Sequence, residues 1–187
     1  MAIKIYIDQG HGPGGVNGGA EGLFGLVEQD VTYQVGKYLE SLLNNTPGYE
    51  AKVSRPTPET ILGYNTSTSL IARVNDANEW GANYFISIHC NAAENPEYNG
   101  TEVYVYSQIS RAYPLAQEIL AQIVKQLGTK NNGVLVRQNL YVLRRTFMPS
   151  LLVELGYITN PSDAEKLMNN QFEFAQAIYD AIRIQLG

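Results

Sequence analysis

Short apolar runs alternate along the chain with stretches in which apolar residues recur every three or four positions. The runs Tyr84–Ile88 and Ser150–Val153 are almost continuously apolar, which is typical of strands covered on both faces of a sheet. Helical stripes run through residues 31–43, 115–127 and 174–182. Strands that alternate with helices in this way indicate an α/β domain whose sheet is largely parallel.

The alternation predicts a single domain, residues 1–187, with a twisted sheet of about six strands flanked by helices. A chain of this length can bury one hydrophobic core, and no repeat or linker divides it. A further helix is expected from Asn160, a capping residue followed by Pro161. Loops are expected at Gln9–Gly25, which contains eight glycines, and at Thr57–Ser69. The expected strands are Ile3–Asp8, Glu50–Ser54, Tyr84–His89, Thr101–Tyr106, Leu140–Arg144 and Ser150–Glu154.

Charge and hydropathy exclude several classes of partner. The formal net charge of −5 argues against nucleic-acid binding, because phosphate contacts need clustered Lys and Arg. No apolar stretch approaches the roughly 18 residues of a membrane-spanning helix, so we expect no membrane partner. The first residues lead directly into a strand, without the apolar segment and cleavage site of a secretory signal. The single cysteine, Cys90, excludes an intramolecular disulfide.

His11 and His89 are the only histidines, and each lies at the carboxyl end of an expected strand. In open α/β sheets, sites form outside these ends of the strands. A lone histidine in a loop is usually solvated, and one at a strand end usually completes the core. Two at the same edge make a shared site the better interpretation. Two imidazoles and a carboxylate are a usual zinc ligand set, with one position left for water.

The residue types alone do not decide which carboxylate completes such a site. Glu21, Glu28 and Asp30 all lie between the glycine-rich loop and the first amphipathic helix, where an acid can also simply stabilise the helix N-terminus. Glu154 ends an apolar strand, where a poorly hydrated carboxylate is expected to face a metal, a substrate or a base. Cys90 alternates with His89 to the opposite face of the sheet and is interpreted as a packing residue.

The glycine-rich loop also contains Gly10-x-Gly12-x-x-Gly15, a pattern found in dinucleotide-binding proteins. That fingerprint requires a helix to begin at once, with its amides facing the pyrophosphate. Here Pro13 and further glycines are expected to keep the chain irregular. A nucleotide-binding enzyme is therefore the weakest of the functional hypotheses.

Five segments, in order along nearly the whole chain, resemble the zinc-dependent N-acetylmuramoyl-L-alanine amidases of the amidase_3 type. By this resemblance His11, Glu28 and His89 are zinc ligands, and Glu154 is the catalytic glutamate. Asn91 and Arg144 match positions near the site and are expected to contact substrate. Asn91 could equally hold the loop after His89, and Arg144 could pair with a carboxylate. The five segments are Ile7–Gly12, Gly25–Val31, Ser87–Ala92, Tyr141–Arg144 and Leu152–Asn160.

The resemblance implies a hydrolase of peptidoglycan that cleaves the amide between N-acetylmuramic acid and L-alanine with one Zn²⁺ per chain. We expect a monomer that acts on the cell wall outside the cytoplasmic membrane; phage lysin, autolysin and sporulation enzyme all stay open. Gln9 stands where proline is common, Cys90 where alanine is common, and Glu59–Ser69 is longer than usual. The alternatives are another zinc amide hydrolase, of carboxypeptidase or N-acyl amino acid type, and a non-catalytic wall-binding module.

Overall fold

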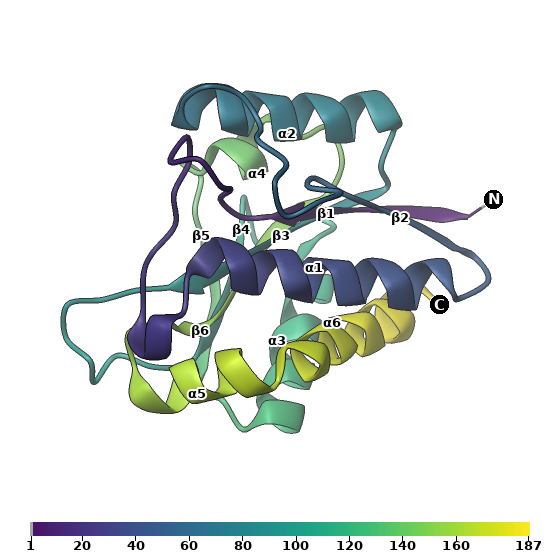
Figure 1. Ribbon diagram of the computed structural model, residues 1–187. Coiled ribbons are helices and arrows are strands. Elements are labelled where there is room, and N and C mark those ends of the chain that lie inside the picture. Colours follow the sequence, from purple (N-terminus) through teal and green to yellow (C-terminus); the bar gives the residue numbers. More distant parts are fainter. Residues whose placement is uncertain (1) are drawn as a thin grey trace.

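A sheet between two layers of helices makes up the computed structural model, which describes residues 2–187 (Figure 1). Helices α2 and α4 lie on one face of the sheet, and α1, α3, α5 and α6 lie on the other. The strands are β1 (Ile3–Gln9), β2 (Tyr49–Val53), β3 (Tyr84–Asn91), β4 (Thr101–Val105), β5 (Asn131–Val136) and β6 (Ser150–Tyr157). The helices are α1 (Glu28–Asn44), α2 (Thr66–Trp80), α3 (Tyr113–Leu127), α4 (Tyr141–Arg145), α5 (Pro161–Asn169) and α6 (Gln171–Leu186), with the 3-10 turn η1 (Leu23–Gly25).

The sheet formed by residues 2–187 has six strands in the order β2-β1-β3-β6-β4-β5. Every neighbouring pair is parallel except β4 and β6, which run antiparallel. The predicted α/β class with a largely parallel sheet is therefore confirmed. Because β1, β3 and β6 run in the same direction, their carboxyl ends meet at one edge of the sheet.

The two faces of the sheet pack against separate cores. Ile7, Ile88 and Val153 belong to the larger core, under α1, α3 and α6. Tyr6 and Leu152 belong to a smaller core under α2 and α4. Since successive strand residues point to opposite faces, the strand residues that alternate with the larger core face α2 and α4. These are Asp8, Ser87, His89, Glu102 and Glu154. Within residues 2–187 no helix is long and apolar enough to cross a membrane.

The expected strand Leu140–Arg144 is wrong: this segment forms the short helix α4. Val142 and Leu143 are buried against Leu152, while Arg144 and Arg145 are exposed. Periodicity cannot distinguish a strand from a helical turn over so few residues. The missing strand is β5, which is polar at its start and largely exposed, so it lacks the apolar run by which strands were recognised.

Helix α2 begins inside the expected loop Thr57–Ser69 and was not predicted. Asn65 starts it: its side chain accepts a hydrogen bond from the Thr68 amide at 2.9 Å, and the Thr68 hydroxyl accepts one from the Asn65 amide at 3.0 Å. The buried face of the helix includes Ser69 and Arg73 as well as apolar residues. The apolar period that identifies an amphipathic helix is weak here because part of the buried face is polar.

Arg73 of α2 and Asp8 of β1 form a buried ion pair at 2.6 Å, with side chains only 1% and 2% exposed. The other oxygen of Asp8 accepts a hydrogen bond from the Ser87 hydroxyl of β3 at 2.7 Å. Burial opposes the charge on Asp8, but Arg73 and Ser87 outweigh it and hold the pKa of this carboxyl below its usual value. The pair therefore joins a helix and two strands while both residues stay charged.

Asp8→Asn is expected to lower the free energy of unfolding by about 3–5 kcal/mol, because it leaves the buried guanidinium of Arg73 without a counter-charge. Urea unfolding followed by circular dichroism measures the change. Glu40→Gln is the matched control, since Glu40 pairs with Lys37 near the helix surface and its loss should cost about 0.5 kcal/mol or less. Equal stability of the two variants would contradict a structural role for the buried pair.

Candidate functional site

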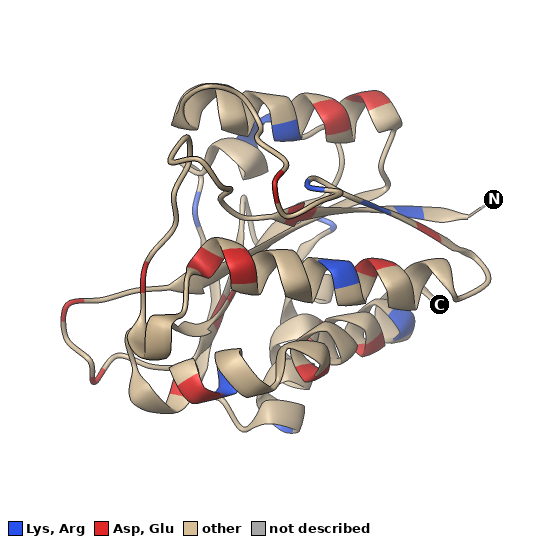
Figure 2. Ribbon diagram, in the orientation of Figure 1, with Lys and Arg blue, Asp and Glu red and all other residues tan. Residues whose placement is uncertain are grey.

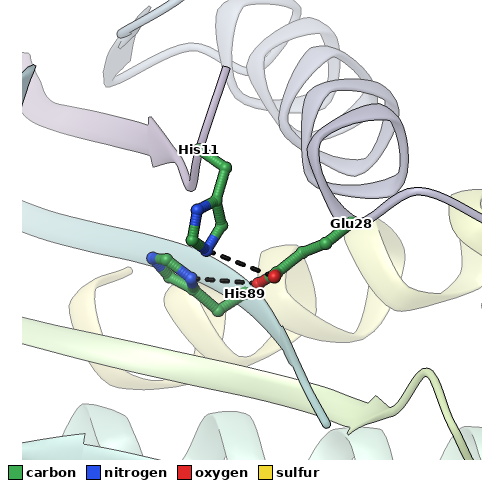
Figure 3. Close-up of side chains that lie close together, drawn as sticks. All are labelled: His11, Glu28 and His89. Carbon is green, nitrogen blue, oxygen red and sulfur yellow. Dashed lines mark hydrogen bonds and ion pairs between the residues drawn. The ribbon is translucent and has the colours of Figure 1, made fainter. Parts of the chain in front are cut away.

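His11, Glu28 and His89 come together at the carboxyl edge of the sheet (Figure 3). His11 follows β1, His89 lies in β3, and Glu28 is the first residue of α1. One potential ligand atom from each of the three side chains lies within 4.8 Å of the others. The predicted cluster of two histidines and Glu28 therefore has the proximity that a shared metal requires. Glu21 and Asp30, the other carboxylates considered, are exposed and lie outside it.

The Glu28 carboxylate lies between the two imidazoles. One oxygen is 3.2 Å from His11 Nε2, and the other is 3.1 Å from His89 Nδ1. The backbone amides of Ala20 and Cys90 each donate to it at 2.9 Å. Burial disfavours the charge, but the hydrogen bonds and charges of the two histidines outweigh it and hold the pKa of Glu28 well below its usual value. Glu28 is therefore an anion, as a metal ligand must be.

The loop that carries His11 has an unusual backbone. His11 itself has a φ of 65°, in the left-handed region that residues with a side chain seldom adopt. The Arg73 guanidinium donates to the carbonyl oxygen of Gln9 at 2.6 Å and also to that of His11. These bonds compensate for the strain, which is of the order of 1–3 kcal/mol for such a residue. The buried arginine thus fixes the backbone from which His11 projects.

Two glycines of this loop are required by close packing around the cluster. A Cβ on Gly10 would lie 2.5 Å from the His89 ring, and one on Gly19 would lie 2.7 Å from Glu28 Oε2. No helix follows Gly15 directly, because the chain stays irregular until η1 at Leu23. The dinucleotide pattern therefore lacks the helix N-terminus that its chemistry needs. The glycines instead let backbone approach the histidine and the carboxylate.

One donor atom of the cluster has no partner within the protein. His11 Nδ1 is shielded from solvent, and none of residues 2–187 forms a hydrogen bond with it. Buried polar atoms are rarely left in this state without a missing water or ion. Two imidazoles and an ionised carboxylate form the donor set of a transition-metal site. The side chains therefore fit a divalent metal ion.

Glu154 lies next to the cluster, in β6, where it pairs in register with His89 of β3. Its Oε2 atom is shielded from solvent and has no hydrogen-bond partner among residues 2–187. Burial, followed by the charges of Glu28 and Glu102, raises the pKa of Glu154 well above its usual value. A carboxyl group with a raised pKa in this position can both accept and return a proton.

Neither Asn91 nor Arg144 belongs to the cluster of His11, Glu28 and His89. Asn91 donates to Glu102 Oε1 at 2.5 Å and accepts from the Ala92 amide at 2.9 Å, so its contacts support the loop after β3. Arg144 is exposed on α4 and lines a pocket with Ser150, the first residue of β6, four positions before Glu154. Substrate contact by either residue stays a prediction.

Sequence reasoning missed Glu102, a carboxylate that is only 8% exposed. It accepts hydrogen bonds from Asn91 and from the Tyr104 hydroxyl, at 2.5 and 2.6 Å, and pairs with Glu154 across β4 and β6. Its alternation with Val103 in an expected strand was the signal that could have found it. Cys90 packs in the larger core, and burial raises the pKa of its thiol, which agrees with the packing interpretation.

Comparison with known proteins decides the family. The sequence profile of the amidase_3 family, described as N-acetylmuramoyl-L-alanine amidase, matches residues 5–184. The chain belongs to this amidase family. It is 36% identical to the amidase CwlM of Bacillus licheniformis over 172 residues, 91% of this chain and 62% of that protein. It is 37% identical to the amidase LytC of Bacillus subtilis over 180 residues, 94% of this chain and 34% of that protein. The chain thus spans only part of these relatives.

Solved structures of the amidase family share the whole fold. The amidase AmiC2 of Nostoc punctiforme superposes with a TM-score of 0.86 at 35% identity, covering 98% of this chain and 97% of that one. The catalytic domain of the amidase CwlV from Bacillus (Paenibacillus) polymyxa gives a TM-score of 0.86 at 30% identity, with 98% of each chain covered. These likenesses confirm the resemblance that the five sequence segments predicted.

Gly19→Ala is expected to weaken binding of a divalent metal about 10- to 100-fold, because the added Cβ displaces the Glu28 carboxylate. Gly18→Ala is the matched control, since a Cβ there meets no atom within 4 Å. Competition with a chromogenic chelator measures both affinities, and circular dichroism checks that both variants fold. Equal affinities would mean that the close approach at Gly19 does not position Glu28.

Proposed function

We propose that this amidase-family chain hydrolyses the amide bond between N-acetylmuramic acid and the first L-alanine of the peptide stem of peptidoglycan. It would do so with one zinc ion per chain, outside the cytoplasmic membrane. The observation that carries the proposal is the convergence of His11, Glu28 and His89 beside Glu154, in a chain matched by the amidase profile over residues 5–184.

His11, Glu28 and His89 are the residues that would hold the metal. A zinc ion with three protein ligands activates water at neutral pH and polarises the carbonyl of a scissile amide. The chain would supply the ligands in a suitable state, since the pKa of Glu28 is held well below its usual value and His11 Nδ1 has no hydrogen-bond partner among residues 2–187. The backbone amides of Ala20 and Cys90 donate to the carboxylate and would keep it in place.

Glu154 would move the proton in this reaction. Its carboxylate takes a proton from the attacking water and passes it to the departing nitrogen of L-alanine, acting first as base and then as acid. An amine is a poor leaving group unless it is protonated, so the second transfer matters as much as the first. The shielded Oε2 atom and the raised pKa of Glu154 favour a carboxyl that holds this proton until the nitrogen takes it.

The main rival is a zinc hydrolase for other amides, such as a carboxypeptidase-like or N-acyl amino acid hydrolase. Digestion of purified peptidoglycan, followed by mass spectrometry, separates the two, because only a muramoyl amidase releases new L-alanine amino termini. The other rival is a wall-binding module without catalysis. Such a module has no need of Glu154 beside a complete ligand cluster, and it would bind peptidoglycan without turnover.

The purified protein is expected to contain one zinc ion per chain, and removal of zinc with a chelator should abolish activity that added zinc restores. His89→Ala should lose most of the bound zinc because only two protein ligands remain. Glu21→Ala is the control and should keep its zinc, since Glu21 is exposed and lies outside the cluster. Metal content is measured by mass spectrometry of the dissolved protein. Two tightly bound metals, or full activity without metal, would contradict the one-zinc proposal.

Glu154→Gln is expected to fold normally, keep its zinc and lose wall hydrolysis by about 100- to 10,000-fold, because the amide cannot accept the proton of water. Release of L-alanine amino termini, zinc content and melting temperature are measured on the same sample. Glu173→Gln, an exposed carboxylate on α6, is the control and should retain full activity. Near-normal turnover with intact zinc would remove Glu154 from the mechanism, whereas loss of zinc would make it a ligand.

A further inference from the structure

Four arginines lie in α4 or in the loops that follow β4 and β5, although the chain as a whole has a net charge of −5. They are Arg111, Arg137, Arg144 and Arg145, and all four are exposed. Among residues 2–187, none of them forms an ion pair with a carboxylate. Acidic residues are instead spread over α1, α2, α5 and α6 (Figure 2). The unneutralised arginines therefore give this part of an acidic protein a local positive charge.

Two of these arginines line a pocket of about 290 Å³ between the end of β4 and the segment that joins α4 to β6. Arg111 and Arg144 supply the cations, and the hydroxyl of Ser110 adds a neutral donor, whereas the Thr146 hydroxyl donates to the Val142 carbonyl oxygen. Phe147, which is 88% exposed, provides an apolar wall. No acidic residue of the described chain lines the pocket. Guanidinium groups beside an apolar wall suit a carboxylate on a short hydrocarbon, and the volume suits a group of amino-acid size.

The pocket lies on the same face of the sheet as Glu154. Ser150, which lines the pocket, is four positions before Glu154 on β6. Strand residues an even number of positions apart lie on the same face, so both face α2 and α4. Their separation of four residues along β6 corresponds to about 13 Å. The same face of β4 presents Glu102 and Tyr104. A row of side chains thus leads from the metal cluster to the pocket.

The distance matches the length of an extended peptide that begins at the reacting centre. A peptide in extended conformation advances about 3.3 Å per residue, so the fourth residue of a stem held at its first residue beside Glu154 lies about 10 Å along the row, and its terminal carboxylate reaches the pocket. The peptide stems of peptidoglycan carry free carboxylates beyond the first L-alanine. Between the two ends, Arg137 lies over the Tyr104 ring at 5.2 Å and adds a positive charge along the row.

We propose that the pocket of Arg111 and Arg144 binds a carboxylate of the peptide stem, on the fourth residue beyond the scissile amide. This inference rests on the proposed amidase function, because it takes the first residue of the stem to lie beside Glu154. It assigns Arg144 a substrate contact remote from the metal cluster, and it brings in Arg111, which the sequence did not single out. The pocket would therefore select the length and charge of the stem.

The test compares two substrates with the same scissile bond, N-acetylmuramoyl dipeptide and N-acetylmuramoyl tetrapeptide. Arg144→Gln and Arg111→Gln are each expected to raise KM for the tetrapeptide substrate about tenfold, the loss of one charge-assisted hydrogen bond. The kcat for the tetrapeptide and both constants for the dipeptide should not change. Arg145→Gln is the matched control: it is the neighbouring exposed arginine of α4, but it does not line the pocket.

Calorimetry with the free tetrapeptide measures the same pocket without turnover, so it decides the inference even if the amidase proposal fails. Arg144→Gln should bind the peptide about tenfold more weakly than Arg145→Gln. Equal affinities, or equal effects of Arg144→Gln on both muramoyl substrates, would overturn the inference. The inference would also be overturned if Arg144→Gln lost binding only to cell walls that carry phosphodiester polymers, because the pocket would then bind those polymers. Failure of the amidase proposal is recognised separately, by the absence of new L-alanine amino termini in wall digests.

Discussion

The arrangement of this domain depends on the hydrogen bonds and the ion pair of one buried group, the guanidinium of Arg73. It joins α2 to Asp8 of β1, and Asp8 is joined in turn to Ser87 of β3. The same group also donates to the carbonyl oxygens of Gln9 and His11. One side chain therefore neutralises a buried charge and fixes the strained backbone at His11. Burying such a charge is costly, and it is tolerated only where every donor has a partner. The arginine thereby fixes β1, which His11 follows, relative to β3, which contains His89.

Two carboxyl groups near the histidines have pKa values that their surroundings shift in opposite directions. Glu28 lies between two imidazoles, whose hydrogen bonds and charges overcome its burial and hold its pKa below the usual value, and two backbone amides also donate to it. The Oε2 atom of Glu154 is shielded without a partner within residues 2–187, and burial together with the charges of Glu28 and Glu102 raises the pKa of this carboxyl. Environments that separate the pKa values of neighbouring acids are typical of sites where one acid binds and the other transfers protons.

The sequence predicted the sheet well because buried parallel strands are apolar runs, and it placed both histidines at one edge from the strand ends alone. It could not predict which acid joins them, since Glu21, Glu28 and Asp30 are equivalent by position, and the choice of Glu28 came from the family resemblance. The amides of Ala20 and Cys90 that hold Glu28 are a tertiary feature. Three elements were missed because their apolar periodicity is weak. Part of the buried face of α2 is polar, β5 is largely exposed, and α4 is only five residues long.

The length of α4 determines how much of one face of the sheet is covered. Parallel sheets are normally covered by helices on both faces, and the larger core here follows that rule. On the other face β4 runs antiparallel to β6, and α4, the helix between β5 and β6, has only five residues. A helix of this length covers Leu152 but leaves the ends of β4 and β5 accessible on this face, where Tyr106 and Leu135 are 40% and 37% exposed. The uncovered part continues along this face towards Glu102 and Glu154, so these two carboxyl groups lie on the face of the sheet that the short helix leaves partly open.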